Sequence, residues 1–356
     1  MTKQFRFGFC GANMAGRIEN FTEAVKFVQI ADSLGIDFCG FNDQLRDVYT
    51  IASICAMSTR HILVGPMASN PYNRHPATMA RGVATIDEVS GGRAFLTLSR
   101  GGGLLGPKQL GYDTRHATER MREAITLIKQ FLTGERVNFD GKFFQVHNVN
   151  IGFKCRANIP VYVAASGPKM IELAGELADG LVTPNSGREI FKITLDPLKR
   201  GLSRSGRNLA NFEIILQPAL QVTNTQEELN QAMNRSRSHV AGLILLTPAE
   251  WLEKTGISKT SIEALTEFTH KNPQLSQAHY YYDQDEEYIK LTRNLVTPEM
   301  YEALSIFGNA QEIAASLTSL QRLGATAVSI WTIPWKLDEK ITAARTIAAK
   351  VVPHFR

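Results

Sequence analysis

The pattern that most constrains the fold of this chain is a helix that ends at glycine and leads directly into a short apolar strand. Residues 19–35 show it best, because their apolar side chains recur at the helical period and Gly35 stops the helix before the strand 36–41. The same junction returns at 320–331 and, in looser form, at 173–182. Strands that are apolar throughout are typical of a parallel sheet covered on both faces. The pattern therefore predicts an α/β fold.

Other short apolar stretches have the same character and extend this sheet. They lie at 6–9, 61–66, 94–99, 159–165 and 214–222. Together with the three strands above they make about eight, mostly separated by helical stretches. In a chain of 356 residues, this count favours a closed (β/α)8 TIM barrel over an open doubly wound sheet. Because periodicity does not report closure, the open sheet remains the alternative.

Two stretches exceed what a bare barrel needs. Residues 103–152 include a helix at 119–132 and a hairpin at 137–146, and residues 232–305 form a long polar, helical insertion. Insertions of this kind usually decorate the carboxyl-terminal face of a barrel. Because no linker separates them from the barrel, we expect one domain over 1–356.

Composition excludes several classes of protein. The net charge of +5 is spread along the chain, and the densest basic stretch, 199–207, has no interleaved aromatic residues, so a surface loop is favoured over a nucleic-acid groove. No apolar run approaches the ~20 residues of a membrane span. Four scattered cysteines without a CxxC pair, and no secretion signal, indicate reduced thiols in a cytoplasmic protein. The histidine spacings contain no metal motif.

In a barrel, function gathers just past the carboxyl ends of the strands. The residues at these positions are small, polar or glycine-rich, which suits close approach to a large ligand. They are Gly11-Ala12-Asn13, Asn42-Asp43-Gln44, Met67 to Pro71, Arg100 to Gly103, Ser166-Gly167-Pro168, Thr183-Pro184-Asn185 and Thr332 to Trp335.

The turn Ser166-Gly167-Pro168 is the best candidate for binding an anion. It follows a buried strand and opens a helix, with Pro168 suited to the first helical turn. Backbone amides at such a helix start are unpaired and bind phosphate readily. A plain strand–helix turn is the alternative, and the local sequence does not exclude it.

Two other strand ends are ambiguous by themselves. The glycines after Arg100 resemble a phosphate loop but lack the P-loop and dinucleotide signatures, so a flexible turn is the simpler interpretation. Asp43 is either an acid/base group or ligand anchor, or the N-cap of the following helix. The chain has no GxSxG elbow and no obvious nucleophile or paired acid, which suits an enzyme whose chemistry is carried by a cofactor.

Three blocks of sequence resemble the bacterial luciferase-like superfamily of flavin- and deazaflavin-dependent oxidoreductases. The first, 70–101, contains Arg74-His75-Pro76 and Ser90-Gly91-Gly92-Arg93, and the second, 159–180, ends in Ala178-Asp179-Gly180. The third, 295–313, looks most like the branch that contains methylenetetrahydromethanopterin reductase. The blocks occur in the family's order and cover nearly the whole chain.

The resemblance implies a barrel whose cofactor ring lies across the strand ends. Asp43 matches an acidic residue beside the ring, and Met67-Ala68 matches a segment that often carries a non-proline cis peptide bond. Residues 165–167 match the phosphate-binding turn. The implied cofactor-binding residues are Asp43, Met67, Ala68, Arg100, Gly101, Ala165, Ser166, Gly167 and Thr183.

The chain departs from the family pattern at one position. Many members have histidine directly after the residue that matches Asp43, whereas here it is Gln44. Glutamine donates a hydrogen bond but does not titrate, so a required proton must come from His75, from the insertion or from the substrate. The candidate catalytic residues are thus Asp43, Gln44 and His75.

The resemblance leaves several functions open. A monooxygenase that uses reduced FMN on a small organic substrate ranks first by a small margin, with a flavin reductase as the expected supplier of reduced cofactor. The alternative is hydride transfer by the deazaflavin coenzyme F420, and the second alternative is a flavin-binding protein without catalysis. The resemblance also implies a homodimer. We expect no nucleic-acid or membrane partner and no metal.

Overall fold

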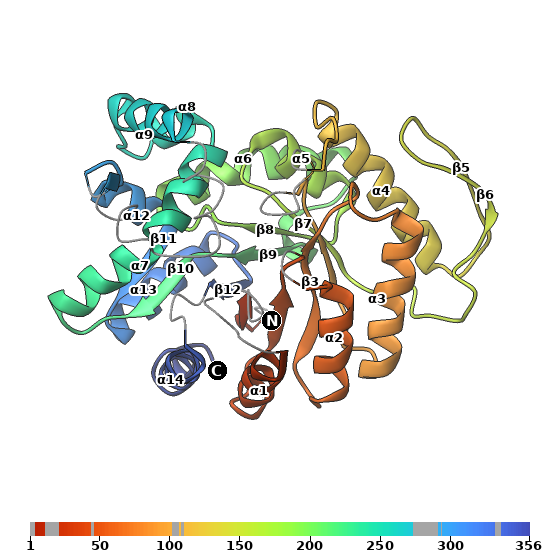
Figure 1. Ribbon diagram of the computed structural model, residues 1–356, viewed down its shortest axis with the longest axis horizontal. Coiled ribbons are helices and arrows are strands. Elements are labelled where there is room, and N and C mark those ends of the chain that lie inside the picture. Colours follow the sequence, from red (N-terminus) through yellow and green to blue (C-terminus); the bar gives the residue numbers. More distant parts are fainter. Residues whose placement is uncertain are drawn as a thin grey trace.

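The chain folds into a closed barrel of eight parallel strands, seen in the computed structural model of Figure 1. The structure describes residues 4–10, 21–43, 46–101, 107, 110–272, 291–292, 294–331 and 336–356. The barrel strands are β1 (Arg6–Cys10), β2 (Phe38–Phe41), β3 (Leu63–Ser69), β4 (Leu96–Leu98), β7 (Val161–Ala164), β8 (Gly180–Thr183), β9 (Glu213–Leu216) and β12 (Ala327–Trp331). The predicted TIM barrel is therefore confirmed.

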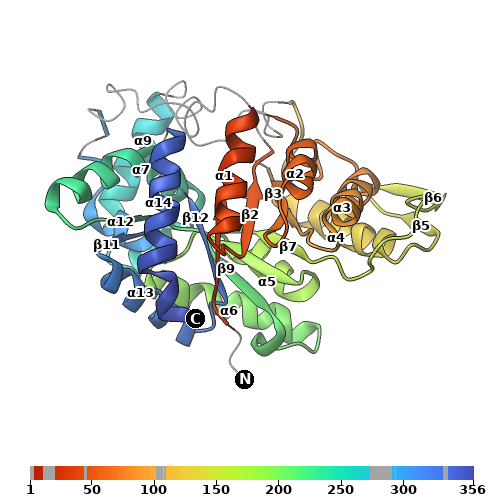
Figure 2. The same ribbon diagram turned by 90° about the horizontal axis from the view of Figure 1, so that it is seen from below.

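Pairing between the first and last strands closes the barrel. In the β1–β12 register, Arg6 lies opposite Ala327 and Cys10 opposite Trp331. Helices surround the barrel because the outward side chains of the strands are apolar and need cover (Figure 1). They are α1 (Phe21–Ser33), α2 (Val48–Met57), α3 (Pro76–Ser90), α4 (Ala117–Leu132), α5 (Pro168–Leu177), α6 (Arg188–Arg204), α13 (Ala310–Arg322) and α14 (Leu337–Lys350), with short 3-10 turns at Leu209–Asn211 and Val352–Phe355. In Figure 2, α14 and α1 stand side by side across this closure.

The strand predicted over 214–222 is not one strand. It divides into β9 and β10 (Ala219–Val222), and Pro218 lies in the break. Proline has no amide hydrogen to donate, so it interrupts a ladder where it occurs. β9 pairs with β8 inside the barrel, whereas β10 pairs with β11 (Ser305–Gly308), a strand that the sequence did not predict.

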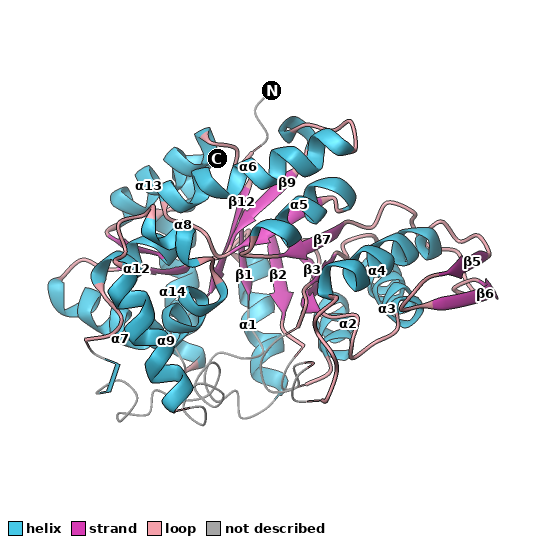
Figure 3. Ribbon diagram, turned by 90° about the horizontal axis from the view of Figure 1, so that it is seen from above, coloured by secondary structure: helices cyan, strands magenta, loops and turns pink. Residues whose placement is uncertain are grey.

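The two predicted excursions lie on opposite sides of the barrel (Figures 1 and 3). The hairpin is confirmed as the antiparallel pair β5 (Val137–Asp140) and β6 (Gln145–Val149) beyond α4. On the other side lie α7 (Gln226–Leu246), α8 (Ala249–Glu253), α9 (Lys259–Lys271) and α12 (Pro298–Leu304), which share an apolar core of their own. Part of the insertion, including Tyr280 to Tyr282, lies outside the described residues.

The interior of the barrel changes character along its axis. At the amino ends of the strands, side chains of large volume fill it, and we call this group the floor: Arg6, Phe38, Phe95, Tyr162 and Glu213. Arg6 Nη2 and the Tyr162 hydroxyl both donate to Glu213 Oε2, at 2.5 and 2.6 Å. Higher up, Gly8 makes room, since a Cβ there would lie 2.4 Å from the Phe38 ring. The floor is therefore packed, and its polar groups pair with one another.

The basic stretch 199–207 is not the surface loop that we predicted. Most of it is the last part of α6, and its three arginines pair within the molecule. Arg200 and Arg204 contact Glu172 of α5, and Arg207 donates to the Ala178 and Gly175 carbonyl oxygens at 2.7 and 2.6 Å. In the described part of the chain, no helix is long and apolar enough to cross a membrane.

Candidate active site

The carboxyl ends of the barrel strands meet on one face, which we call the mouth. Its described residues are Cys10, Asn42, Asp43, Ser69, Thr97 to Gly101, Ala165 to Gly167, Thr183 to Ser186 and Trp331. Neighbouring strand ends contact each other directly, as Cys10 Sγ donates to Asn42 Oδ1 at 3.1 Å. The described residues that the sequence placed at separate strand ends are thus brought to one face, whereas 11–13, 44, 102–103 and 332–335 lie outside the described residues.

Asp43 lies at the mouth and does not cap a helix. The N-cap of α2 is Asp47, whose Oδ1 accepts from the Thr50 amide at 2.8 Å, so the capping interpretation of Asp43 is wrong. Asp43 Oδ2 instead accepts from the Ser69 hydroxyl at 3.0 Å. Burial raises the pKa of Asp43, while the Ser69 hydrogen bond and the charge of Arg74 oppose that rise. The pKa of Asp43 is therefore above that of a free aspartate.

Of the other two candidate catalytic residues, Gln44 and His75, the structure describes only His75. Gln44 lies outside the described residues. His75 is the N-cap of α3, with Nδ1 accepting from the Ala77 amide at 3.2 Å, and its ring meets Phe144 edge-on at 5.4 Å. Burial lowers its pKa. One ring nitrogen of His75 is thus engaged in capping, and its catalytic role remains a prediction.

The segments expected around a cofactor ring have distinctive backbones. The Met67–Ala68 peptide bond is cis, as the family resemblance implied. Gly101 has φ +83°, and a Cβ there would lie 2.7 Å from Pro107, so this position requires glycine. Arg100 is exposed directly before it. These residues lie at the ends of the neighbouring strands β3 and β4.

The turn predicted to bind phosphate has the geometry of an open helix start. Gly167 is the N-cap of α5, no side chain caps the helix, and Pro168 begins it as expected. No described atom lies within 4 Å of the place a Gly167 Cβ would take. The first-turn amides of a helix have no partner within it and carry partial positive charge. The start of α5 therefore offers donors to an anion.

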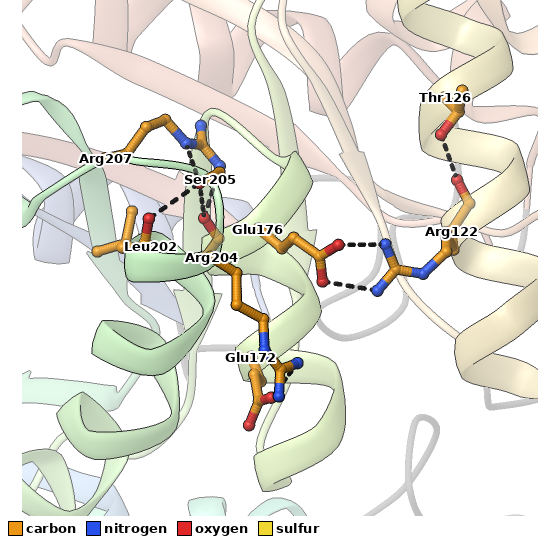
Figure 4. Close-up of polar contacts among 9 residues, drawn as sticks. Arg122, Thr126, Glu172, Glu176, Leu202, Arg204, Ser205 and Arg207 are labelled. Carbon is orange, nitrogen blue, oxygen red and sulfur yellow. Dashed lines mark hydrogen bonds and ion pairs between the residues drawn. The ribbon is translucent and has the colours of Figure 1, made fainter.

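Interactions along α5 hold this helix start in place (Figure 4). Arg122 of α4 donates two hydrogen bonds to Glu176, at 2.5 and 2.6 Å, and Arg204 of α6 pairs with Glu172. α5 and α6 also approach closely, since a Cβ on Gly201 would lie 1.9 Å from the Glu172 carbonyl oxygen. Arg207 binds carbonyl groups at the carboxyl end of α5, where a cation is favoured.

Neighbouring segments also bind the turn. The Ser166 hydroxyl donates to the Leu246 carbonyl oxygen, at the end of α7, at 3.0 Å. The Ser166 carbonyl oxygen accepts from Asn185 Nδ2 at 3.2 Å. The Ala165 amide pairs with Val182, and the Thr183 hydroxyl accepts from the Asn185 amide at 3.3 Å. The amides of α5 are therefore better placed to bind a ligand than the Ala165 amide or the Thr183 hydroxyl.

The family model described as luciferase-like monooxygenase matches residues 5–327. The chain belongs to this luciferase-like family. It is accordingly an oxidoreductase, as the family resemblance implied.

Individual relatives place the chain within the luciferase-like family. It is 31% identical over 304 residues to the 5,10-methylenetetrahydromethanopterin reductase of Archaeoglobus fulgidus, covering 85% of this chain and 87% of that protein. It is 35% identical over 167 residues to the F420-dependent glucose-6-phosphate dehydrogenase of Beutenbergia cavernae, covering 46% and 50%. The coenzyme F420 dependent tetrahydromethanopterin reductase of Methanopyrus kandleri shares the fold, with a TM-score of 0.81, 23% identity and full coverage of both chains.

The mouth of this luciferase-like barrel also contains polar atoms that sequence reasoning missed. Among the described residues, Thr97 Oγ1, Asn185 Oδ1 and Ser186 Oγ are buried and have no hydrogen-bond partner. Buried polar atoms are normally paired, so these three atoms are exceptions within the fold. The uncapped start of α5 is the part of the mouth whose donors are open to a ligand. Also at the mouth, Trp331 stacks on His239 of α7 at 4.8 Å between ring centroids. No local signal marks the hydroxyls, because they sit within apolar or turn-like sequence.

Proposed function

We propose that this protein is an F420-dependent oxidoreductase that exchanges a hydride between the cofactor and a small organic substrate. One observation carries the proposal: the open, uncapped start of α5 lies in a chain whose curated relatives include F420-dependent enzymes. The sequence alone ranked FMN first. The relatives reverse that order, because the three similar proteins named above are F420-dependent enzymes or reductases by name.

The residues present fit a ring with an anionic tail. The amides at the start of α5, next to Gly167, would bind the phosphate, because no side chain caps this helix and the space before it is open. When bound, F420 supplies a two-electron hydride carrier that does not activate oxygen readily. Asp43 would hold or release the accompanying proton, because burial raises its pKa. The floor closes the opposite end of the barrel, so ligands enter at the mouth.

A spectroscopic titration of the purified protein with F420 and with FMN tests the proposal. We expect F420 to bind at least tenfold more tightly than FMN. We also expect oxidation or reduction of F420 with some member of a substrate panel that includes methylenetetrahydromethanopterin and glucose 6-phosphate. Tighter binding of FMN, with oxygen consumption, would favour a monooxygenase instead. Binding without any turnover would favour a flavin-binding protein.

Substitutions at Gly167 test where the phosphate binds. Gly167→Asp places a negative charge at the start of α5, so affinity for either cofactor should fall at least tenfold. Gly167→Ala is the matched control, because its methyl group enters open space at a φ of −103° and should leave affinity within about twofold. An unchanged affinity in folded Gly167→Asp would remove this turn from the site.

Assembly and location are part of the same proposal. We expect a homodimer that works in the cytoplasm on a small-molecule substrate. Sedimentation at several protein concentrations checks the dimer, and a monomer at every concentration would contradict it.

A further inference from the structure

Asp43 has a buried hydroxyl group directly behind it. Ser69 ends β3 and is fully buried, and its Oγ lies 3.0 Å from Asp43 Oδ2. Ser69 donates to Asp43 Oδ2 and not to Oδ1, the other oxygen of the carboxyl group. The two oxygens of this carboxyl are therefore not equivalent.

A second hydroxyl lies behind Ser69. Tyr49 is the second residue of α2, and its ring is fixed from two sides. The Arg74 guanidinium lies over the ring at 4.7 Å, and a Cβ on Gly82 of α3 would come within 2.5 Å of a ring carbon. Arg74 is itself paired with Asp47, the N-cap of α2. The Tyr49 ring thus has little freedom to move.

The Tyr49 hydroxyl faces Ser69 and is buried. Burial raises the pKa of the Tyr49 phenol, and the nearby Ser69 hydroxyl opposes that rise. Its oxygen has no hydrogen-bond partner among the residues that the structure describes. A phenol donates readily, and the Ser69 oxygen keeps free lone pairs when its own proton points to Asp43. The three groups therefore stand in the order Tyr49, Ser69, Asp43, with the Ser69 hydroxyl between the phenol and the carboxyl.

We propose that Asp43 is the proton donor and acceptor of the mouth, and that Ser69, backed by Tyr49, is its positioning residue, directing the reactive proton to Oδ1. This inference rests on the proposed function, because the proposed hydride transfer leaves one proton to be supplied or taken up. It also explains how the protein can work with the non-titrating Gln44 next in sequence.

The atoms of the step balance. Reduction of a C=O or C=N group by hydride adds two electrons and one hydrogen to carbon, which leaves the oxygen or nitrogen short of one proton. The O–H bond at Asp43 Oδ1 would break, the proton would form the new O–H or N–H bond, and Asp43 would remain as a carboxylate until solvent returns a proton. In the oxidative direction, the carboxylate takes the proton instead.

The groups that act on the Asp43 carboxyl set the expected pH behaviour. Burial raises its pKa, and the Ser69 hydroxyl and the Arg74 charge lower it. Tyr49, from α2, is the titratable group behind Ser69. Because the Ser69 hydrogen bond favours the carboxylate, its removal must raise the pKa of Asp43 further.

The test is the pKa of Asp43, measured by carbon-13 NMR of aspartate-labelled protein with the signal assigned by its loss in Asp43→Asn. In Ser69→Ala the pKa should rise by about one pH unit, the size expected from one lost charge-assisted hydrogen bond. Ser69→Thr keeps the hydroxyl and should restore the original value. Tyr49→Phe should raise the pKa by a smaller amount, and it keeps the inference testable if Ser69→Ala does not fold. Ser33→Ala, an exposed serine on α1, is the matched control and should change nothing.

Kinetics supply the second readout. The pH profile of kcat should move by the same amount as the pKa, while the KM for F420 stays unchanged. An unmoved NMR pKa in both Ser69→Ala and Tyr49→Phe would overturn the inference even if F420 turns over normally. If F420 does not bind or turn over, the proposed function fails, whereas a shifted pKa would still establish that Ser69 positions Asp43.

Discussion

Polar side chains at the two ends of the barrel interior differ in burial and pairing. The Arg6–Glu213 pair at the floor is half-buried, whereas Thr97 and Asn185 are fully buried. At the floor, Glu213 accepts hydrogen bonds from Arg6 at 2.5 Å and from Tyr162 at 2.6 Å. Aromatic rings surround these three groups. At the mouth, Thr97 and Asn185 each keep a buried oxygen that lacks a partner among the described residues. The polar groups of the floor thus satisfy one another, whereas these two oxygens of the mouth do not.

This difference in pairing suggests that the floor contributes mainly to stability and the mouth mainly to binding. Unpaired buried polar atoms cost free energy, so Thr97 and Asn185 lower the stability of the fold, whereas the paired groups of the floor do not. If this division holds, substitutions at the floor should change stability and leave binding intact. Substitutions at the mouth should do the reverse.

The largest loss of stability is expected at the floor. Arg6→Ala leaves the half-buried Glu213 carboxylate with only the Tyr162 hydroxyl as partner, which should lower the free energy of unfolding by about 2 kcal/mol, between the values for exposed and buried ion pairs. Denaturant unfolding measures this, and F420 affinity of the folded variant should stay unchanged. Arg122→Ala breaks an ion pair of similar geometry on the outer surface and should cost less than about 1 kcal/mol. A large loss of F420 affinity in Arg6→Ala would break the division.

Lys340 tests whether an unpaired buried group always marks a ligand site. It lies in the first turns of α14, is 1% exposed, and has no hydrogen-bond partner for Nζ among the described residues. Burial lowers its pKa to about 8, only partly offset by the charges of Glu23 and Cys39. Lys340→Met should therefore stabilise the protein at pH 7 by about 2 kcal/mol, without changing F420 binding.

The stability that Lys340→Met gains should decrease as the pH rises. The unfolded chain binds the Lys340 proton up to about pH 10.5, whereas the folded chain releases it near pH 8. The stability of the unsubstituted protein relative to Lys340→Met should rise between these values, so the advantage of methionine shrinks as pH increases. Unfolding curves at pH 7, 9 and 10 check this, and a constant difference would contradict it.

The smallest effect on stability is expected at the mouth. Thr97→Val replaces an unpartnered, fully buried hydroxyl with a methyl group of similar size, so the free energy of unfolding should stay the same or rise by up to about 1 kcal/mol. F420 affinity should fall about fivefold if this hydroxyl binds the cofactor. Thr97→Ser keeps the hydroxyl and should bind better than the valine variant. Equal affinities in both variants would remove Thr97 from the site.

Sequence reasoning found the barrel because its signals are local. Gly35 and Gly324 end helices just before β2 and β12, and the predicted strand 327–331 has the bounds of β12. The break at Pro218 and the strand β11 were missed, since strand pairing depends on residues far apart in sequence. The predicted start of α5 at Pro168 was correct for the same local reason that glycine and proline mark turns.

The side chains of the site were harder to find. Asp43 and Asp47 are four residues apart, and only the structure shows that Asp47 caps α2 while Asp43 meets Ser69. Tyr49 sits in a helix that is apolar on nearly every side, so its hydroxyl gives no sequence signal. Thr97 lies inside an apolar strand. Hydroxyls become recognisable only when folding leaves them buried without a partner.

Closure of the barrel between β1 and β12 has a consequence for synthesis of the chain. Of the barrel strands, β1 emerges from the ribosome first and β12, with which Arg6 to Cys10 must pair, emerges last. Until then one edge of the growing sheet stays open, and open edges invite pairing with other chains. We therefore expect a nascent chain that stalls before residue 327 to be a preferred client of chaperones.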